Sequence, residues 1–417
     1  MDKLKIIGKA SINGSINIPG AKNAALPAMV ASMLSENGLF LKNLPVVQDI
    51  STMKYLLESF GIKIKQINSQ TFFDSNYIKN HIAQYDLVRK MRASILVLGP
   101  LIARFKKAKI SLPGGCSIGT RPIDIHLKGL EKLGVKFFIE NGFVSGEVKK
   151  NLYGALINLS FPSVGATENI MMAASLAEGE TIIENAAREP EIVDLAKCLN
   201  NMGAKIIGAG TSQIRIEGVK SLSQTEHTII SDRIVAGTYV MAAIMLNNKF
   251  TINNIDPSLL STPIKVLQNM GAKLDIGNDF IKVLPSHTIK GTTVETQPYP
   301  GFPTDLQAQI MTLMSIAKGN SQIKEKIFEN RFMHVSELNR LGANIKIKND
   351  IAYIEGDKKL KGAQVMASDL RASVSLVLAG LYAEGETTIN RVYHLDRGYE
   401  KIEEILGKCG PKITRIK

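Results

Sequence analysis

Leu133-Gly134-Val135-Lys136 ends a segment whose apolar residues recur every three or four positions and begins one in which they alternate. The first pattern is typical of an amphipathic helix and the second of a strand, and glycine readily takes the left-handed conformation that ends a helix. The glycines of the six similar phrases are separated by 73, 69, 68, 71 and 68 residues, which predicts an internal repeat. The phrases are Phe60-Gly61-Ile62-Lys63, Leu133-Gly134-Val135-Lys136, Met202-Gly203-Ala204-Lys205, Met270-Gly271-Ala272-Lys273, Leu341-Gly342-Ala343-Asn344 and Cys409-Gly410-Pro411-Lys412.

Each repeat contains a second helix upstream of the one that its glycine ends. These helices are small and apolar, and a short strand such as Glu180-Thr181-Ile182-Ile183 links the two helices of a repeat. The repeat is therefore expected to fold as βαβαββ, with two helices and a four-stranded sheet, in a protein of the α/β class. The upstream helices are predicted at 23–34, 92–102, 168–176, 233–245, 306–317 and 371–383.

Length and composition indicate a globular protein with more than one domain. The chain has 417 residues, of which 45% are hydrophobic and 21% charged. An odd number of widely spaced cysteines, Cys116, Cys198 and Cys409, argues against a disulfide framework and favours a reducing compartment. The N-terminal residues lack the apolar core of a signal peptide, and the longest apolar run, 93–103, is too short to cross a bilayer. We expect a cytoplasmic protein without a membrane partner.

The net charge of +13 favours anionic partners, which include nucleic acids and phosphorylated small molecules. The lysines are dispersed, Trp is absent, and basic residues do not alternate with aromatic ones as in proteins that stack bases. Nucleic acid is therefore not expected as a partner, although a basic repeat protein that binds RNA would also explain the charge and the repeats. No pair of Cys or His residues has the spacing of metal ligands, so no metal site is predicted.

Charged or polar residues occur near the start of each upstream helix, 36 to 42 residues before the repeat's glycine. A helix N-terminus presents free N–H groups and a positive dipole end, so a neighbouring Lys or Arg creates an anion site. The alternative is that the acidic residues are ordinary N-caps and the arginines are solvated. The residues near the helix starts are Lys22, Arg92, Thr167, Arg233, Asp305 and Arg371; the candidate caps are Asp86, Asp232, Asp305 and Asp369.

Five further motifs, together with the repeats, give the sequence a family resemblance over essentially its whole length. They are PGAKNAALP (19–27), LPGGCSIGTRPID (112–124), FPTDLQAQ (302–309), FENRFMH (328–334) and HLDRGYEKI (394–402). The set resembles the UDP-N-acetylglucosamine enolpyruvyl transferases, which share a superfamily with the shikimate-phosphate enolpyruvyl transferases. The second group is the alternative, but it usually has Gly-Asp-Lys-Ser where this chain has Gly20-Ala21-Lys22-Asn23, and the Cys116 loop also disfavours it.

The resemblance implies two inside-out α/β barrels, or α-β prisms, each of three repeats. One domain would span 22–229 and the other 1–21 together with 230–417. The implied reaction is the first committed step of peptidoglycan precursor synthesis. It moves the enolpyruvyl group of phosphoenolpyruvate to the 3'-hydroxyl of UDP-N-acetylglucosamine by addition and elimination, releases phosphate, and uses no cofactor.

The same resemblance assigns residues to the three demands of this chemistry: a cationic clamp, an acid for C3 and a base for the sugar hydroxyl. Cys116 is the implied acid, since a thiol near cationic groups has a lowered pKa, and Asp305 is the implied base, with Asp369 as a second candidate carboxylate. Arg397 could instead pair with the adjacent Asp396. The implied clamp consists of Lys22, Asn23, Arg121 and Arg397, with Arg92 and Arg371 nearby.

The nucleotide sugar is assigned to two further segments and one isolated residue by the resemblance. In one departure, Phe161 stands where some members carry a lysine, so backbone amides of 163–165 would carry more of the diphosphate contact. His126 either takes part in binding or is only structural. The implied contacts are Arg121, Pro122, Ile123, Asp124 and Ile125 for uridine, Ser163, Val164 and Gly165 for the diphosphate, and Ile327 on the sugar side.

Overall fold

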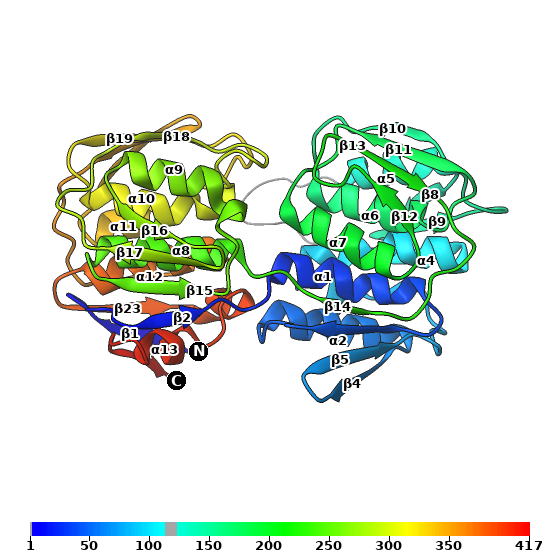
Figure 1. Ribbon diagram of the computed structural model, residues 1–417, viewed down its shortest axis with the longest axis horizontal. Coiled ribbons are helices and arrows are strands. Elements are labelled where there is room, and N and C mark those ends of the chain that lie inside the picture. Colours follow the sequence, from blue (N-terminus) through cyan, green and yellow to red (C-terminus); the bar gives the residue numbers. More distant parts are fainter. Residues whose placement is uncertain (1, 113–122) are drawn as a thin grey trace. The chain divides into compact units, whose positions relative to one another are not determined.

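The computed structural model describes residues 2–112 and 123–417, and these form six four-stranded sheets, one for each repeat. Contacts divide them into two compact units, one within 20–230 and the other formed by the residues up to Pro19 together with 231–417. In each unit the sheets lie on the outside, and helices such as α6 (Val164–Ala174) and α10 (Gln307–Ile316) run between them (Figure 1). The predicted βαβαββ repeat and α/β class are confirmed.

The unit within 20–230 contains sheets with strand orders β14-β3-β5-β4, β6-β7-β9-β8 and β10-β11-β13-β12. Its strands are β3 (Leu39–Lys42), β4 (Lys63–Ile67), β5 (Gln70–Asp74), β6 (Ile82–Ala83), β7 (Lys107–Ser111), β8 (Lys136–Glu140), β9 (Phe143–Glu147), β10 (Leu156–Asn158), β11 (Glu180–Glu184), β12 (Lys205–Ile207), β13 (Gln213–Glu217) and β14 (Glu226–Thr228). Its other helices are α1 (Lys22–Ala31), η1 (Ser32–Leu34), α2 (Gln48–Phe60), α3 (Tyr85–Val88), η2 (Arg92–Val97), α4 (Leu98–Phe105), α5 (Asp124–Lys132) and α7 (Pro190–Asn201).

The other unit contains sheets with strand orders β2-β15-β17-β16, β18-β19-β21-β20 and β22-β23-β1-β24. Its strands are β1 (Lys3–Ile7), β2 (Ser15–Asn17), β15 (Phe250–Asn253), β16 (Lys273–Ile276), β17 (Phe280–Leu284), β18 (Thr293–Glu295), β19 (Asn320–Lys324), β20 (Asn344–Lys348), β21 (Ile351–Glu355), β22 (Gln364–Met366), β23 (Glu386–Asn390) and β24 (Ile413–Ile416). Its other helices are α8 (Arg233–Met245), η3 (Pro257–Leu260), α9 (Ser261–Asn269), η4 (Thr304–Leu306), α11 (Val335–Arg340), α12 (Leu370–Tyr382), η5 (Val392–Arg397) and α13 (Ile402–Gly407).

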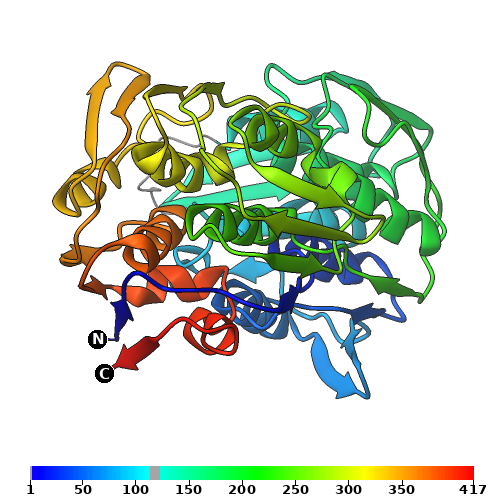
Figure 2. The same ribbon diagram turned by 60° about the vertical axis from the view of Figure 1, so that its left-hand side comes forward.

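Strands from distant parts of the sequence complete these sheets. β1 inserts between β23 and β24, where Leu4 faces Ile389 on one side and Arg415 on the other. Figure 2 shows the first and last strands of the chain side by side. β2 pairs in parallel with β15, so both N-terminal strands belong to the unit that contains 231–417.

The six repeat glycines adopt the expected left-handed conformation, with φ between 97° and 124°. The upstream helices form the centre of each unit, and α8 is buried along its whole length. An apolar surface on all sides is what such a position requires, which explains why α8 is not amphipathic. No helix within residues 2–112 and 123–417 has both the length and the apolarity needed to cross a membrane.

The predicted helix starts are partly wrong. Thr167 lies inside α6, whose N-cap is Ser163, and Asp86 lies in the first turn of α3 without capping it. Asp232 and Asp369 are N-caps, since each side chain accepts hydrogen bonds from two backbone N–H groups of the following helix. Asp305 is not a cap, because its carboxylate is held by side chains instead.

Candidate active site

The Asp305 carboxylate is held between two arginines from different elements. Asp305 lies in η4, directly before the buried helix α10. Its Oδ1 accepts a hydrogen bond from Arg331 at 2.8 Å and its Oδ2 accepts one from Arg371 at 2.7 Å. The arginine side chains are only 4% and 7% exposed, whereas that of Asp305 is 27% exposed. The arrangement presents a partly exposed carboxylate whose two ion-pair partners are buried.

The two arginines come from a helix and from a turn. Arg371 follows the N-cap Asp369 in α12, and Arg331 lies between β19 and α11. Burial acts to lower the pKa of Arg371, but the attraction and hydrogen bond of Asp305, together with Tyr399, outweigh it, and the pKa is raised. Arg371 therefore stays charged.

His334 is buried beside this cluster and is expected to be neutral. Burial lowers its pKa to about 4, an effect that Asp369 opposes and Arg331 reinforces. A neutral imidazole adds no further positive charge next to the two arginines.

Glu325 connects the segment of Ile327 to that of Asp305. Its Oε1 accepts hydrogen bonds from the backbone N–H groups of Ile327 and Phe328 at 2.8 and 3.2 Å, and its Oε2 accepts one from Thr304 at 2.9 Å. Glu325 is 5% exposed. The buried Glu325 carboxylate thus holds the backbone of Ile327, the candidate sugar contact, close to Thr304. Thr304 directly precedes the candidate base in the sequence.

Arg397 ends η5, and the neighbouring Asp396 does not serve as its partner. Asp396 instead accepts two hydrogen bonds from Arg415 of β24, at 3.0 and 2.7 Å, and Arg415 also binds Glu403 at 2.6 Å. The alternative in which Asp396 neutralises Arg397 is therefore wrong. Arg415 anchors the chain on both sides of Arg397.

In the unit within 20–230, Lys22 begins α1 and forms a buried ion pair. Its Nζ lies 3.1 Å from Asp49 Oδ2 in the first turn of α2, and the two side chains are 11% and 4% exposed. Asn23 follows Lys22 in α1 and is half-buried. The lysine is thereby fixed at a helix N-terminus, where an anion would meet both its charge and the helix dipole.

The predicted uridine segment enters α5, where Asn169 of α6 orients His126. Asn169 Oδ1 accepts a hydrogen bond from Gly99 N at 2.6 Å, so its Nδ2 is the atom that faces His126 Nδ1 at 3.1 Å. Nδ1 is then the acceptor, and Nε2 carries the proton of the neutral ring. Burial, followed by repulsion from Arg92, lowers the His126 pKa to about 4, and Asp124 opposes this shift. Ile123, Asp124 and Ile125 are half-buried at the start of α5.

Ser163, Val164 and Gly165 lie at the N-terminus of α6, where Ser163 is the N-cap. Ser163 caps the helix by accepting a hydrogen bond from Ala166 N at 3.3 Å. A Cβ added to Gly165 would lie 3.1 Å from the His126 ring, so the glycine lets the ring approach the helix start. Phe161 is exposed and brings no charge to this end of the helix.

Cys116, Arg121 and Pro122 lie outside the described residues. The other two cysteines, Cys198 and Cys409, are buried as expected and form no disulfide. Burial raises the pKa of both thiols, which makes them poor nucleophiles.

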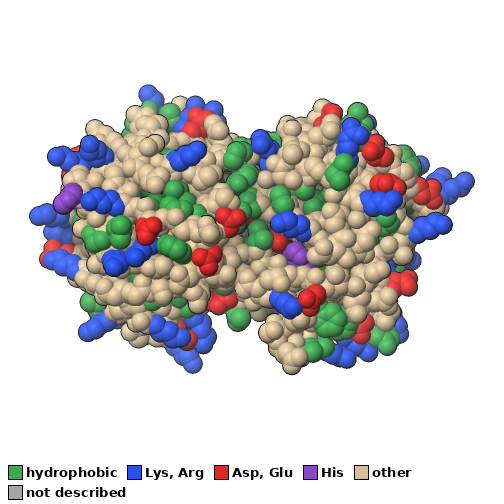
Figure 3. Space-filling view, in the orientation of Figure 1, with side chains coloured by type: hydrophobic (Ala, Val, Ile, Leu, Met, Phe, Trp, Pro, Cys, Tyr) green, Lys and Arg blue, Asp and Glu red, His purple; other side chains and the backbone are tan. Residues whose placement is uncertain are grey.

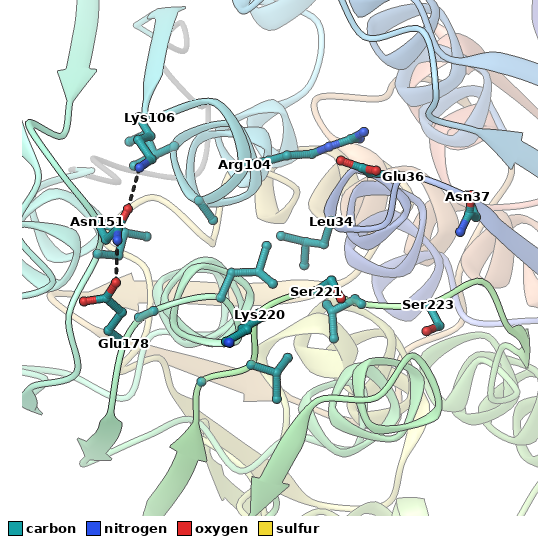
Figure 4. Close-up of a pocket in the computed structure, with 18 residues that line it drawn as sticks. Leu34, Glu36, Asn37, Arg104, Lys106, Asn151, Glu178, Lys220, Ser221 and Ser223 are labelled. Carbon is teal, nitrogen blue, oxygen red and sulfur yellow. Dashed lines mark hydrogen bonds between the residues drawn. The ribbon is translucent and has the colours of Figure 1, made fainter.

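A cavity of about 570 Å³ in the unit within 20–230 contains none of the candidate residues in its lining. In Figure 4, Lys106 donates to Asn151, and Asn151 donates to Glu178 along its rim. The cavity is therefore not the candidate active site. Within residues 2–112 and 123–417, no three His, Cys, Asp or Glu side chains are grouped to hold a metal ion.

Known proteins match the chain from end to end. A family model described as EPSP synthase (3-phosphoshikimate 1-carboxyvinyltransferase) matches residues 6–406. The UDP-N-acetylglucosamine 1-carboxyvinyltransferases of Granulibacter bethesdensis and Azorhizobium caulinodans are 52% and 53% identical to it, and each alignment covers 100% of both proteins. The chain belongs to the UDP-N-acetylglucosamine 1-carboxyvinyltransferase family.

Solved structures support the fold of this 1-carboxyvinyltransferase family member. The enolpyruvyl transferase NikO from Streptomyces tendae has a TM-score of 0.90 at 23% identity, covering 99% of this chain and 98% of NikO. EPSP synthase from Acinetobacter baumannii has a TM-score of 0.78 at 19% identity and covers 100% of both chains. The inside-out barrel architecture that the family resemblance implied is confirmed.

In this 1-carboxyvinyltransferase family member, two of the predicted site residues, Asp305 and Arg371, contact each other in one cluster. Sequence reasoning missed Arg331 and Asp49, the ion-pair partners of Asp305 and Lys22. Arg331 lies in the motif FENRFMH, so the motif signalled the segment but not the contact. In the sequence, Asp49 is recognisable only as an acidic residue near the start of a helix, which does not indicate a functional contact.

Proposed function

We propose that the protein transfers the enolpyruvyl group of phosphoenolpyruvate to the 3'-hydroxyl of UDP-N-acetylglucosamine and releases phosphate. The observation that carries this proposal is the Asp305 carboxylate, which is partly exposed and bound on both oxygens by buried arginines. A carboxylate fixed by two buried cations suits a reaction between a sugar hydroxyl and a trianionic substrate. Relatives of about 50% identity named for this activity support the same substrates.

In this proposal Asp305 removes the proton of the 3'-hydroxyl, whose oxygen bonds to C2 of phosphoenolpyruvate while Cys116 protonates C3. Elimination then removes a proton from C3, re-forms the double bond and breaks the C2–O bond to phosphate. Lys22, Asn23, Arg121 and Arg397 bind phosphoenolpyruvate, with Arg92 and Arg371 nearby. Guanidinium groups match carboxylate and phosphate oxygens in pairs, which is why arginine predominates among them.

The sugar nucleotide would bind through residues 121–125, the turn at 163–165 and Ile327. The N-cap geometry of Ser163 supports the diphosphate assignment, because the first N–H groups of α6 have no partner within the helix. We further propose domain boundaries at 21/22 and 229/230. A cytoplasmic location is supported by the thiols of Cys198 and Cys409, which are free.

Phosphate release from phosphoenolpyruvate tests the proposal when UDP-N-acetylglucosamine and shikimate 3-phosphate are offered in parallel. We expect phosphate release when UDP-N-acetylglucosamine is the acceptor and none when shikimate 3-phosphate is the acceptor. Release only with shikimate 3-phosphate would support the alternative transferase. Release with neither, combined with RNA binding that weakens steeply with salt, would support the nucleic-acid alternative. On the face seen in Figure 3, Lys and Arg side chains are interspersed with Asp and Glu side chains on each unit. This mixed charge argues against the nucleic-acid alternative.

A further inference from the structure

Three buried polar side chains connect the segment of Asp305 to the segment that follows Arg397. Thr238 comes from α8 and Gln309 from α10, and both are fully buried, while Tyr399, two residues after Arg397, is 2% exposed. Thr238 Oγ1 lies 2.8 Å from the Tyr399 hydroxyl and 3.1 Å from Gln309 Nε2. Gln309 Nε2 also donates to the backbone oxygen of Asp305 at 3.0 Å.

The direction of each hydrogen bond follows from the chemistry of the groups. The single hydroxyl proton of Thr238 is donated to Ile234 O at 2.8 Å, so Thr238 Oγ1 can only accept from its other two neighbours. The donors are the Tyr399 hydroxyl and the Gln309 amide. Burial raises the pKa of Tyr399, so the phenol keeps the proton that it donates. One oxygen atom therefore receives hydrogen bonds from two different segments.

The segment that contains Arg397 is held on both sides of that residue. A Cβ added to Gly398 would lie 2.7 Å from Leu370 Cδ2, which shows how tightly the backbone lies against α12. Arg415 holds Asp396 on the other side. The Tyr399 hydroxyl bonds to Thr238 of α8, and Thr238 in turn accepts a hydrogen bond from Gln309. Gln309 also donates to the backbone oxygen of Asp305.

We propose that Thr238 is a positioning residue, whose hydroxyl oxygen fixes the Arg397 segment relative to Asp305. The proposal rests on the proposed function, in which Arg397 binds phosphoenolpyruvate and Asp305 acts on the sugar hydroxyl. Thr238 itself does not act on substrate. Its effect is expected in turnover, because small displacements of catalytic groups reduce rate more than binding.

The test compares Thr238→Val, which keeps the shape and removes the oxygen, with Thr238→Ser, which keeps the oxygen. We expect kcat for phosphate release to fall about 10-fold or more in Thr238→Val, because buried donors lose their acceptor, with KM for both substrates changed less than about 3-fold. Thr238→Ser should stay within about 2-fold of the unmodified enzyme. Tyr399→Phe should resemble Thr238→Val, and the double variant should be little worse than either single one.

Thr312→Val is the matched control. Thr312 is also a fully buried helical threonine of this unit, and its hydroxyl donates to Ala308 O at 3.0 Å rather than joining this chain of contacts. Loss of this hydroxyl should lower the unfolding temperature less than Thr238→Val does, because no buried donor loses its acceptor, and kcat should remain within about 2-fold. Equal loss of kcat in both valine variants would overturn the proposal, because it would reflect general damage to the core.

The remaining outcomes separate this proposal from the proposed function. An unmodified enzyme that releases no phosphate would refute the function itself. An active unmodified enzyme with full kcat in Thr238→Val would refute only the positioning role. If Thr238→Val does not fold, Tyr399→Phe decides, since it keeps the ring and removes only the donor; unchanged kcat in that variant would overturn the proposal.

Discussion

Arg331 donates to Asp305 Oδ1 at 2.8 Å from a side chain that is 4% exposed. The two residues are 26 positions apart, and the contact places a buried positive charge beneath the candidate base. Arg371 makes the equivalent contact on the other oxygen. The orientation of the carboxylate therefore depends on both arginines.

Replacing Arg331 with methionine should lower turnover about 10-fold or more. The methionine keeps an apolar stem but removes a charge-assisted hydrogen bond, which contributes about 1.5–3 kcal/mol. Phosphate-release kinetics measure the effect. Arg340→Met is the control, because the Arg340 side chain is 60% exposed, and it should leave turnover unchanged. Full turnover in Arg331→Met would mean that Arg371 alone positions the carboxylate.

Asp305→Asn should reduce turnover by about 10²-fold or more, the usual scale for a general base. Asp369→Asn is the matched control, since asparagine caps a helix about as well as aspartate and Asp369 is a genuine N-cap. The control should keep both its unfolding temperature and its turnover. The opposite pattern, with Asp369→Asn inactive and Asp305→Asn active, would assign the base to Asp369.

His334 should make the folded protein less stable as pH falls from about 6.5 to about 4. Its pKa is lowered to about 4 in the folded state, chiefly by burial, so below about 6.5 the unfolded chain binds a proton that the folded chain does not. The loss should reach about 1.4 kcal/mol per pH unit from this residue. Urea unfolding at pH 7, 6 and 5 measures the slope.

The control for this pH dependence is a histidine at the surface. His334→Gln should reduce the slope, whereas His287→Gln should leave it unchanged because His287 is exposed. Equal slopes in the unmodified protein and in His334→Gln would show that His334 does not stay neutral on folding.

Fosfomycin, an epoxide phosphonate that resembles phosphoenolpyruvate, should alkylate Cys116 selectively. Burial raises the pKa of the Cys198 and Cys409 thiols, so neither supplies a reactive thiolate. Peptide mass mapping with and without UDP-N-acetylglucosamine identifies the labelled residue. Label on Cys198 or Cys409 would contradict the assignment of Cys116.

Two substitutions separate the acid role of Cys116 from its reactivity. Cys116→Asp should retain enolpyruvyl transfer, since a carboxyl group can donate the proton, but should no longer be alkylated. Cys116→Ala should lose transfer because no acid remains. Full turnover by the alanine variant would remove Cys116 from the mechanism.

The repeat architecture was predictable from sequence because its signals are local. A glycine that must adopt a positive φ at the end of a helix can be recognised from the residues next to it in the sequence. Gly61, Gly203 and Gly342 have positive φ as expected. The helix starts were less predictable. Asp305 and Asp369 occupy similar places in the sequence, yet only Asp369 is a cap.

The sequence alone therefore determined the repeats, the fold class and the segments that carry the candidate site. Only the tertiary structure decided which side chains meet: Arg331 and Asp305 are 26 residues apart, Arg371 and Asp305 are 66 apart, and Thr238 and Tyr399 are 161 apart. Backbone conformation follows from short-range sterics, which a few residues encode. The partner of a buried charge or hydroxyl is set by the packing of distant helices, because desolvation makes an unpaired group too costly and the available partner depends on the whole fold.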